Sequence, residues 1–172
     1  MKFYLSGGME FKKGLGKNWR VNLTEKLEQL GHEALDPVKM ELDNAEAANF
    51  DWKANKQAED LTLYREMVRK HMFRKDMAAI QKSDATILLY DESVRKGAGT
   101  LAEAWECFRE GKPVYLITEF TREEVPGWLI GETTRIFRTP GQVVDYIRDT
   151  TRVQQDIKEA KTIRDRCLGG IY

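Results

Sequence analysis

Residues 85–90, ATILLY, form a continuous apolar run in the middle of the sequence. A short apolar run without polar alternation is typical of a central parallel strand that helices cover on both faces. It falls far short of the roughly 20 apolar residues that a membrane-spanning helix needs, and no other stretch of the sequence approaches that length. We therefore expect an α/β protein whose sheet is built around this strand.

Strand-like runs and helical periodicities alternate along the rest of the chain. The helix expected over residues 60–82 contains two apolar sets that are slightly out of phase, which predicts a kink. Strands that alternate with helices indicate a doubly wound, flavodoxin-like sheet of five parallel strands with helices on both faces. The predicted strands are 2–6, 32–35, 85–90, 113–118 and 134–138, and the predicted helices are 18–30 with Asn18 as N-cap, 60–82, 100–110 and 142–168.

Two segments exceed what a small sheet requires. Residues 38–58 are polar and lack clean periodicity, so we expect an insertion or lid there. The helix expected over residues 150–166 is charged all round and longer than one face of the sheet needs. We expect this helix to pack on a second subunit, so the chain, a single domain over residues 1–172, is predicted to form a homo-oligomer.

Charge and cysteine content exclude several classes of partner. The chain carries 28 Lys and Arg residues against 28 Asp and Glu residues, so no global field attracts a nucleic acid polymer or an anionic membrane. Cys107 and Cys167 lack metal-ligand spacing and are expected to be reduced thiols. With only His32 and His71 beside them, no metal site is expected. The N-terminal strand lacks the apolar segment of about 7 to 15 residues found in signal peptides, which predicts a cytoplasmic protein.

The candidate site follows from the expected sheet. In an open parallel sheet, ligands bind where loops follow the carboxyl ends of the strands. Three segments are expected to meet there: Ser6-Gly7-Gly8-Met9, then Asp36, and then Gly97-Ala98-Gly99-Thr100 with Glu103. Their glycines let backbone amides approach a ligand closely. Neither loop has the spacing G-x-G-x-x-G or G-x-x-x-x-G-K-[ST], so neither a dinucleotide nor a triphosphate is indicated.

The same residues also fit purely structural explanations. Thr100 to Glu103 matches a capping box, in which the Glu side chain bonds back to the cap amide of its own helix. Asp76 fits an ordinary surface carboxylate on a helix, and Tyr4 fits a strand residue packed against a helix. The residue pattern by itself leaves these alternatives open.

Four segments form a more specific combination: Tyr4 followed by SGGM, RKDMAAIQKSDATILLY at residues 74–90, GTLAEAWECFREGKPV at residues 99–114, and the C-terminal GGIY. Together they resemble the nucleoside 2-deoxyribosyltransferase family and the related deoxynucleoside monophosphate N-glycosidases. The corresponding family segments are an opening strand with a tyrosine and a small-residue loop, a D-x-x-x-I-x-x-x-D segment, a glycine loop with the catalytic glutamate and a G-K-P-V turn, and a terminus that ends in tyrosine in some members. The clear part covers residues 2–37 and 74–118.

The resemblance implies an enzyme that cleaves or exchanges the N-glycosidic bond of a 2′-deoxynucleoside or its 5′-monophosphate without a cofactor. Glu103 would attack the anomeric carbon and form a covalent intermediate, which a second base or water then resolves. Asp76 would contact and protonate the departing base. Tyr4 would hold the Glu103 carboxylate by a hydrogen bond.

One position departs from the family pattern. Many transferases carry an Asp six residues before the catalytic Glu, where it binds the sugar hydroxyls, and this chain has Gly97 there. Sugar recognition is then expected to use Ser93 or a backbone amide. Lys12, Lys13, Lys17 and Arg20, near the first loop, are candidates to pair with a 5′-phosphate, and two aromatic residues are candidates to stack on the base. The expected substrate contacts are thus Ser6, Gly7, Gly8, Met9, Asp36, Ser93, Gly97, Gly99, Thr100, Trp128 and Tyr172.

Three functional hypotheses follow from the sequence. The first is an enzyme, either a transferase or a hydrolase, whose partners are a small nucleoside or nucleotide and a free nucleobase. The second is a non-catalytic nucleotide-binding sensor on the same fold, in which Glu103 only caps its helix. The third is an interaction module that assembles through its C-terminal helix.

Overall fold

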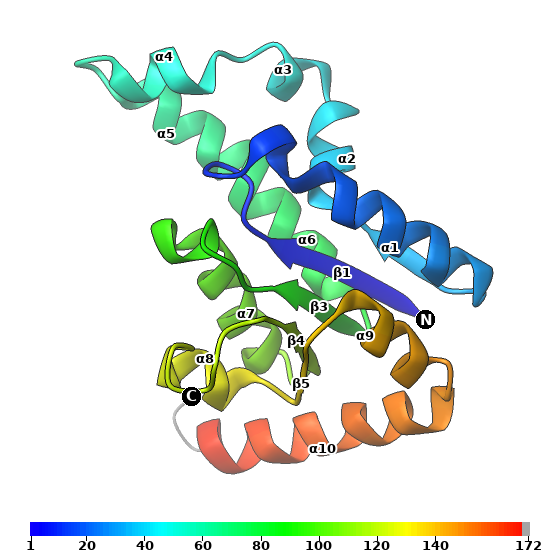
Figure 1. The fold of residues 1–172 in the computed structure, drawn as a ribbon. Coiled ribbons are helices and arrows are strands. Elements are labelled where there is room, and N and C mark those ends of the chain that lie inside the picture. Colours follow the sequence, from blue (N-terminus) through cyan, green and yellow to red (C-terminus); the bar gives the residue numbers. More distant parts are fainter. Residues whose placement is uncertain (170–172) are drawn as a thin grey trace.

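A sheet of five parallel strands forms the centre of the computed structural model, which describes residues 1–169 (Figure 1). The strand order β2-β1-β3-β4-β5 is the doubly wound arrangement that the alternating pattern predicted. The apolar run ATILLY supplies the middle strand, with Ser6 of one neighbour beside Leu88 and Val114 of the other beside Thr86. The strands are β1 (Lys2–Gly7), β2 (Glu33–Leu35), β3 (Ala85–Leu89), β4 (Val114–Ile117) and β5 (Arg135–Phe137).

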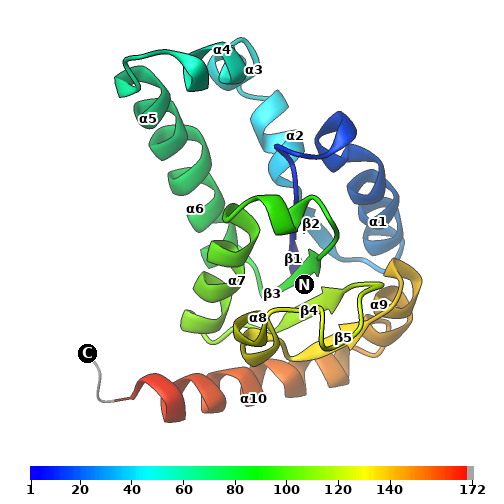
Figure 2. The same cartoon turned by 60° about the vertical axis from the view of Figure 1, so that its left-hand side comes forward.

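Helices cover both faces of the sheet, as Figure 2 shows. Alternate strand residues point to opposite faces, so Phe3 and Ile87 belong to one apolar cluster while Tyr4 and Leu88 belong to the other. The first cluster is closed by α1 (Lys17–Gln29), α9 (Pro140–Ile147) and α10 (Thr150–Leu168). The second is closed by α6 (Arg74–Lys82), α7 (Gly99–Arg109) and α8 (Gly127–Glu132).

The helix predicted over residues 60–82 is helical throughout most of its length but changes its winding midway. It consists of α5 (Thr62–Val68), the π-helical turn η2 (Arg69–Phe73) and α6. The π turn lies between the two apolar sets that are out of phase in the sequence. An extra residue in one turn rotates the helix that follows, which brings Ala79 and Ile80 into the core.

Residues 38–58 are more regular than the sequence predicted. They contain α2 (Pro37–Leu42), α3 (Ala45–Ala48) and α4 (Trp52–Gln57), and the side chains of Asp36, Asn44 and Asp51 cap the three amino termini. Helices of four to six residues are too short to display a hydrophobic period, but their cap residues were visible in the sequence. In both views α3, α4 and α5 project beyond the sheet on the side where β1 ends (Figures 1 and 2).

The long final helix that the sequence predicted from residue 142 is in fact two helices. The first ends at Ile147 with Arg148 as its C-cap. Asp149 caps the second, because its side chain accepts a hydrogen bond from the amide of Thr151 at 3.1 Å. The expectation that α10 is charged all round is also wrong. Val153 and Asp156 are buried against the sheet, and the hydroxyls of Tyr115 and Tyr146 donate to the Asp156 carboxylate.

Three smaller features complete the fold. The first helix begins at Lys17 with Gly16 as its N-cap, so Asn18 is not the cap that we predicted. Gly16 has a left-handed backbone (φ 68°), which glycine adopts without strain. The 3-10 turns η1 (Lys13–Gly16) and η3 (Val94–Lys96) lie in the loops after β1 and β3, and α8 had no counterpart in the prediction. Within residues 1–169, no helix is both long and apolar enough to cross a membrane.

Candidate active site

Two hydroxyl groups of β1 hold the carboxylate of Glu103. Tyr4 and Ser6 are two positions apart on the strand and therefore share one face. The Tyr4 hydroxyl donates to Oε1 of Glu103 at 3.1 Å, and the Ser6 hydroxyl donates to Oε2. Both donors are buried, whereas Glu103 keeps partial exposure. The predicted contact between Tyr4 and Glu103 is present, and Ser6 serves the same carboxylate.

The capping-box alternative for Glu103 is wrong. Helix α7 begins at Gly99, and its N-cap residue is Ala98. Glu103 is therefore the fifth residue of the helix, too far along for the reciprocal bond of a capping box. Its two oxygens instead point to β1, so the carboxylate faces the strand and not the end of its own helix.

Asp76 is a second carboxyl group in the same environment. It lies in the first turn of α6, and its Oδ1 atom is buried without a hydrogen-bond partner among residues 1–169. Burial raises the pKa of Asp76 to about 8, and the negative charge of Glu103 adds to the shift. The ammonium of Lys75 and the hydroxyl of Tyr4 oppose it only in part. Asp76 therefore carries a proton at neutral pH.

The two carboxyl groups differ in the partners that set their pKa values. Burial also raises the pKa of Glu103, but the hydrogen bonds from Ser6 and Tyr4 favour its charged form. Burial and the neighbouring carboxylates raise the pKa of Tyr4 well above its ordinary value, so Tyr4 stays a donor. The two hydrogen bonds from β1 therefore favour the anion at Glu103, while Asp76, which lacks such donors within residues 1–169, favours its protonated form.

Arg20 binds backbone carbonyl groups of β1 and of the loop that follows it. Its side chain has no exposed surface, and it donates to the carbonyl oxygens of Gly7 at 2.7 Å and Leu5 at 3.2 Å. Further bonds run to the carbonyls of Leu15 and Gly16. Because these bonds occupy the buried guanidinium, the expectation that Arg20 pairs with a substrate phosphate is wrong.

Asp36 is tied to the same framework. It is buried, caps α2 by accepting a bond from the Val38 amide at 2.9 Å, and lies 3.6 Å from the Arg20 guanidinium. These contacts account for its position without a ligand. A substrate contact of Asp36 stays a prediction.

The loops after β1 and β3 meet at Gly8 and Ser93. A methyl group added to Gly8 would lie 2.1 Å from the hydroxyl oxygen of Ser93, so only glycine fits this approach. The Ser93 hydroxyl donates to the Asp91 carboxylate, which also forms an ion pair with Lys12. The sequence analysis missed Asp91, although it directly follows the central strand. The Lys12 ammonium is thus paired within the protein.

Gly97 has an aromatic neighbour in place of a carboxylate. A methyl group at Gly97 would lie 3.5 Å from the ring of Phe11, whereas nothing lies within 4 Å of the corresponding position at Gly99. Phe11 in turn packs near Lys56 of α4, whose ammonium is 5.8 Å from the ring centroid and pairs with Glu10. The 38–58 segment therefore contacts the loop that follows β1.

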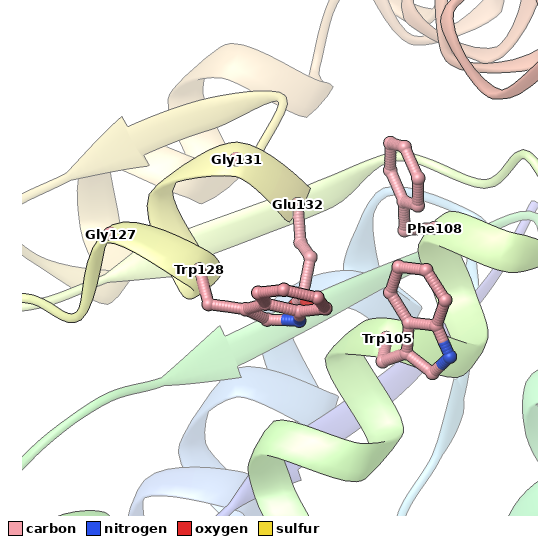
Figure 3. A pocket seen from close by; sticks show the side chains of 6 residues that line it. All are labelled: Trp105, Phe108, Gly127, Trp128, Gly131 and Glu132. Carbon is pink, nitrogen blue, oxygen red and sulfur yellow. The ribbon is translucent and has the colours of Figure 1, made fainter. Parts of the chain in front are cut away.

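The remaining predicted contacts are dispersed. Met9 is half-buried in the loop after β1, and Thr100 is buried in the first turn of α7. Trp128 does not join them, because its ring packs at a tilt against Trp105 of α7, with the centroids 5.7 Å apart (Figure 3). Tyr172 lies outside the described residues.

Glu41 is a buried carboxyl group that sequence reasoning missed. It lies in α2, and its negative charge contributes to the raised pKa of Asp76. The sequence feature that could have revealed it is the Asp36-Pro37 pair, because a cap residue followed by proline often starts a helix. Glu41 lies on the buried side of that helix. Among residues 1–169, no three His, Cys, Asp or Glu side chains are grouped to hold a metal ion.

A comparison with protein families finds one match over most of the chain. The family model described as nucleoside 2-deoxyribosyltransferase matches residues 3–144. That range includes Tyr4, Ser6, Asp76 and Glu103. No curated protein gives a significant sequence match.

Solved structures are similar to this chain at low sequence identity. The 2-deoxyribosyltransferase of the psychrotolerant bacterium Bacillus psychrosaccharolyticus is 23% identical, with a TM-score of 0.62 over 85% of this chain and 92% of that chain. A conserved protein from Enterococcus faecalis V583 is 18% identical, with a TM-score of 0.59 over 87% and 98% of the two chains. The CMP N-glycosidase BcmB of Clostridium botulinum is 17% identical, with a TM-score of 0.49 over 86% and 98%.

Proposed function

This chain belongs to the nucleoside 2-deoxyribosyltransferase family, and from that premise we propose that it cleaves or exchanges the N-glycosidic bond of a 2′-deoxynucleoside or its 5′-monophosphate. Glu103 acts as the nucleophile, Asp76 as the acid, and Tyr4 with Ser6 positions the nucleophile. The observation that carries the proposal is the Glu103 carboxylate held by two hydroxyl donors of β1, with Asp76, whose pKa is raised to about 8, in the same environment.

The first half of the proposed reaction releases the base. An oxygen of Glu103 forms a bond to the anomeric carbon while the bond from that carbon to the base nitrogen breaks. The electron pair of the broken bond goes to the base, and the Asp76 proton goes to a nitrogen of the same base. A carboxylate suits this step because it attacks an oxocarbenium-like centre and also leaves it readily.

The second half regenerates the enzyme. The nitrogen of an acceptor base, or the oxygen of a water molecule, attacks the anomeric carbon, and the bond to Glu103 breaks. Asp76, now ionised, takes up the proton of the attacking group, as microscopic reversibility requires. Attack by a base completes a transfer, and attack by water completes a hydrolysis.

The free nucleoside and its monophosphate remain alternative substrates. Of the four basic side chains near the first loop, Arg20 and Lys12 already have partners within the protein, while Lys13 and Lys17 are exposed. The two alternatives are distinguished by measuring kcat/KM for a deoxynucleoside and for its 5′-monophosphate. Both values are measured in the wild type and in the double variant Lys13→Met/Lys17→Met. A phosphate contact predicts a loss that is confined to the monophosphate.

The reaction itself is tested by incubating the protein with deoxyadenosine, deoxycytidine and their monophosphates, with and without a second free base. Released base without acceptor indicates a hydrolase, and a new nucleoside in the presence of acceptor indicates a transferase. Trapping of a deoxyribosyl adduct on Glu103 by mass spectrometry identifies the nucleophile. Binding of these compounds without any turnover would contradict the proposal and favour the sensor hypothesis.

A homo-oligomer also stays part of this proposal. Helix α10 packs on its own chain through Val153 and Asp156, so a second subunit would have to contact its exposed side, where Ile163 lies. Sedimentation velocity of the full chain measures the state directly. A monomer at all accessible concentrations would remove this part of the proposal and leave the chemistry untouched.

A further inference from the structure

An aromatic hollow lies between α7 and α8, outside the candidate active site (Figure 3). It has a volume of about 370 Å³, which falls within the range of small-ligand sites. Trp105 and Phe108 of α7 form one side. The other side is formed by Gly127, Trp128, Gly131 and Glu132 of α8.

The hollow contains a buried carboxyl group, and in the described part of the chain the indole of Trp128 is the one group that favours its charged form. Glu132 is only 5% exposed, and neither of its oxygens has a hydrogen-bond partner among residues 1–169. Its side chain runs from α8 toward the indole of Trp128 (Figure 3). Burial raises the pKa of Glu132 to about 7, and the nearby indole offsets the shift only in part. A buried polar group without a partner is costly, so this carboxyl group is suited to a ligand that brings a donor.

The rest of the lining consists of aromatic rings and glycine. The ring centroids of Trp105 and Trp128 lie 5.7 Å apart, and Phe108 stacks on Trp105 at the same distance. Trp128 is 72% exposed, so much of its ring is available to a ligand. Aromatic faces attract cations through their quadrupole, and tryptophan does so most strongly.

We propose that this hollow binds a small organic cation, a guanidinium or alkylammonium group on a short apolar chain. The cation pairs with the Glu132 carboxylate once the largely exposed Trp128 side chain turns aside, because both carboxylate oxygens are covered in the unliganded chain. The apolar chain covers the faces of Trp105 and Trp128. A neutral ligand of the same shape would leave the carboxylate uncompensated. An anion would face both the carboxylate and the electron-rich ring faces, so the lining disfavours it.

The hollow is separate from the group that carries the proposed chemistry. Trp105 is two residues beyond Glu103, which places the two side chains roughly 200° apart around α7. Glu103 points to β1, and Trp105 points away from it toward α8. The hollow is therefore a different place from the proposed substrate site, and its test does not require turnover.

The test uses the change in intrinsic fluorescence of the full chain, in which Trp105 and Trp128 are two of four tryptophans. Butylguanidinium is titrated into the wild type at about pH 8.5, where Glu132 is ionised, with butylurea as the neutral probe of the same shape. We expect saturable binding of butylguanidinium to the wild type, with an affinity roughly tenfold higher than that for butylurea. The affinity for butylguanidinium should fall roughly tenfold in Glu132→Gln, and by a similar factor in the wild type at about pH 5.5. Glu123→Gln, an exposed glutamate outside the hollow, is the matched control and retains full affinity.

Several outcomes would overturn the proposal. Equal binding of butylurea, or unchanged affinity in Glu132→Gln, would make the hollow an unspecific apolar surface. Absence of binding by the wild type would remove the site altogether. Trp128→Ala, at an exposed position, gives a second variant with little risk to folding. The wild type could be a dimer that does not bind the probe, with Trp128→Ala a monomer. That result would mean that a second copy of the chain covers the hollow in place of a ligand.

Discussion

The hydroxyl of Tyr4 donates a hydrogen bond to Oε1 of Glu103 at 3.1 Å. This bond joins the first strand to a helix that follows the third, and Ser6 makes a parallel bond from the same strand face. Two residues of β1 thereby fix the direction of one carboxylate and favour its charged form. The proposed nucleophile is aligned before any substrate binds.

Tyr4→Phe removes one of these donors while keeping the ring. We expect kcat to fall by roughly tenfold to a hundredfold, because a hydrogen bond to a charged group contributes about 1.5–3 kcal/mol. The pKa of Glu103 should rise, since the lost bond favours the anion. Steady-state kinetics as a function of pH then shows the acid limb of kcat/KM displaced upward.

Tyr115→Phe is the matched control for this substitution. Tyr115 is also a fully buried strand tyrosine that donates to a carboxylate, but its partner is Asp156 on the other face of the sheet. It should lower the stability without moving the acid limb. If the acid limb of kcat/KM is displaced equally in Tyr4→Phe and Tyr115→Phe, the cause is a general loss of stability and not the bond to Glu103.

Asp76→Asn tests the proposed acid. Release of the base requires the protonated carboxyl group, so the rate of the wild type should fall as the pH rises through about 8, the pKa of Asp76. An asparagine cannot transfer the proton, and the basic limb should disappear together with most of the activity. Single-turnover release of base, measured over the neutral and alkaline range, follows this limb directly. An unchanged basic limb in the variant would assign it to another group.

Asp76 should also make the stability depend on pH. Its pKa rises from 3.8 to about 8 on folding, so between these values the folded state holds a proton that the unfolded state has released. The free energy of unfolding therefore falls as the pH rises across this window. We expect the Tm of the wild type to fall more between about pH 5 and pH 8 than that of Asp76→Asn. Asp145→Asn, at an exposed site on α9, should retain the dependence of the wild type.

The sheet was predictable because each of its strands is a local pattern. The six apolar residues of ATILLY indicate by themselves a strand that is buried on both faces. KFYLS and PVYLIT can also be identified as strands from their own residues. The single helix predicted at the C-terminus failed for the opposite reason. Its break depends on a hydrogen bond from one amide to Asp149, and its buried side depends on Asp156 meeting two tyrosines from elsewhere in the chain.

The candidate site was predictable only as a set of residues. Glu103, Asp76 and Tyr4 stand in segments that resemble a family, but the sequence could not tell a capping box from a carboxylate held by β1. The raised pKa of Asp76 depends on burial and on the charge of Glu41. Glu41 lies in α2, a helix too short to show a hydrophobic period in the sequence. Arg20 was a candidate to pair with a phosphate because its charge was visible in the sequence, whereas its complete burial was not.

Lys112 explains the lysine of the G-K-P-V turn in structural terms. Its ammonium donates to the carbonyls of Ile80, Gln81 and Ser83 at 2.6, 2.6 and 2.7 Å. These carbonyls end α6, where a positive charge is favourable, so the residue after α7 anchors the helix that carries Asp76. Lys112→Met should lower the free energy of unfolding by about 2 kcal/mol, as measured by urea denaturation. Lys82→Met, in the same last turn but exposed, should change it by less than about 0.5 kcal/mol.

Gly8 and Ser93 offer a test of the contact between the two site loops. In Gly8→Ala, the new methyl group would lie 2.1 Å from Oγ and 2.9 Å from Cβ of Ser93, so one loop must move. We expect a loss of about 1–3 kcal/mol in the free energy of unfolding, with a parallel loss of activity. Ser93→Gly removes both obstructing atoms, and the double variant Gly8→Ala/Ser93→Gly should regain most of the loss. Gly99→Ala, where no atom lies within 4 Å of the added methyl, is the control for an alanine that meets open space. If the double variant is as unstable as Gly8→Ala alone, the backbone of the first loop, and not its approach to Ser93, sets the requirement for glycine.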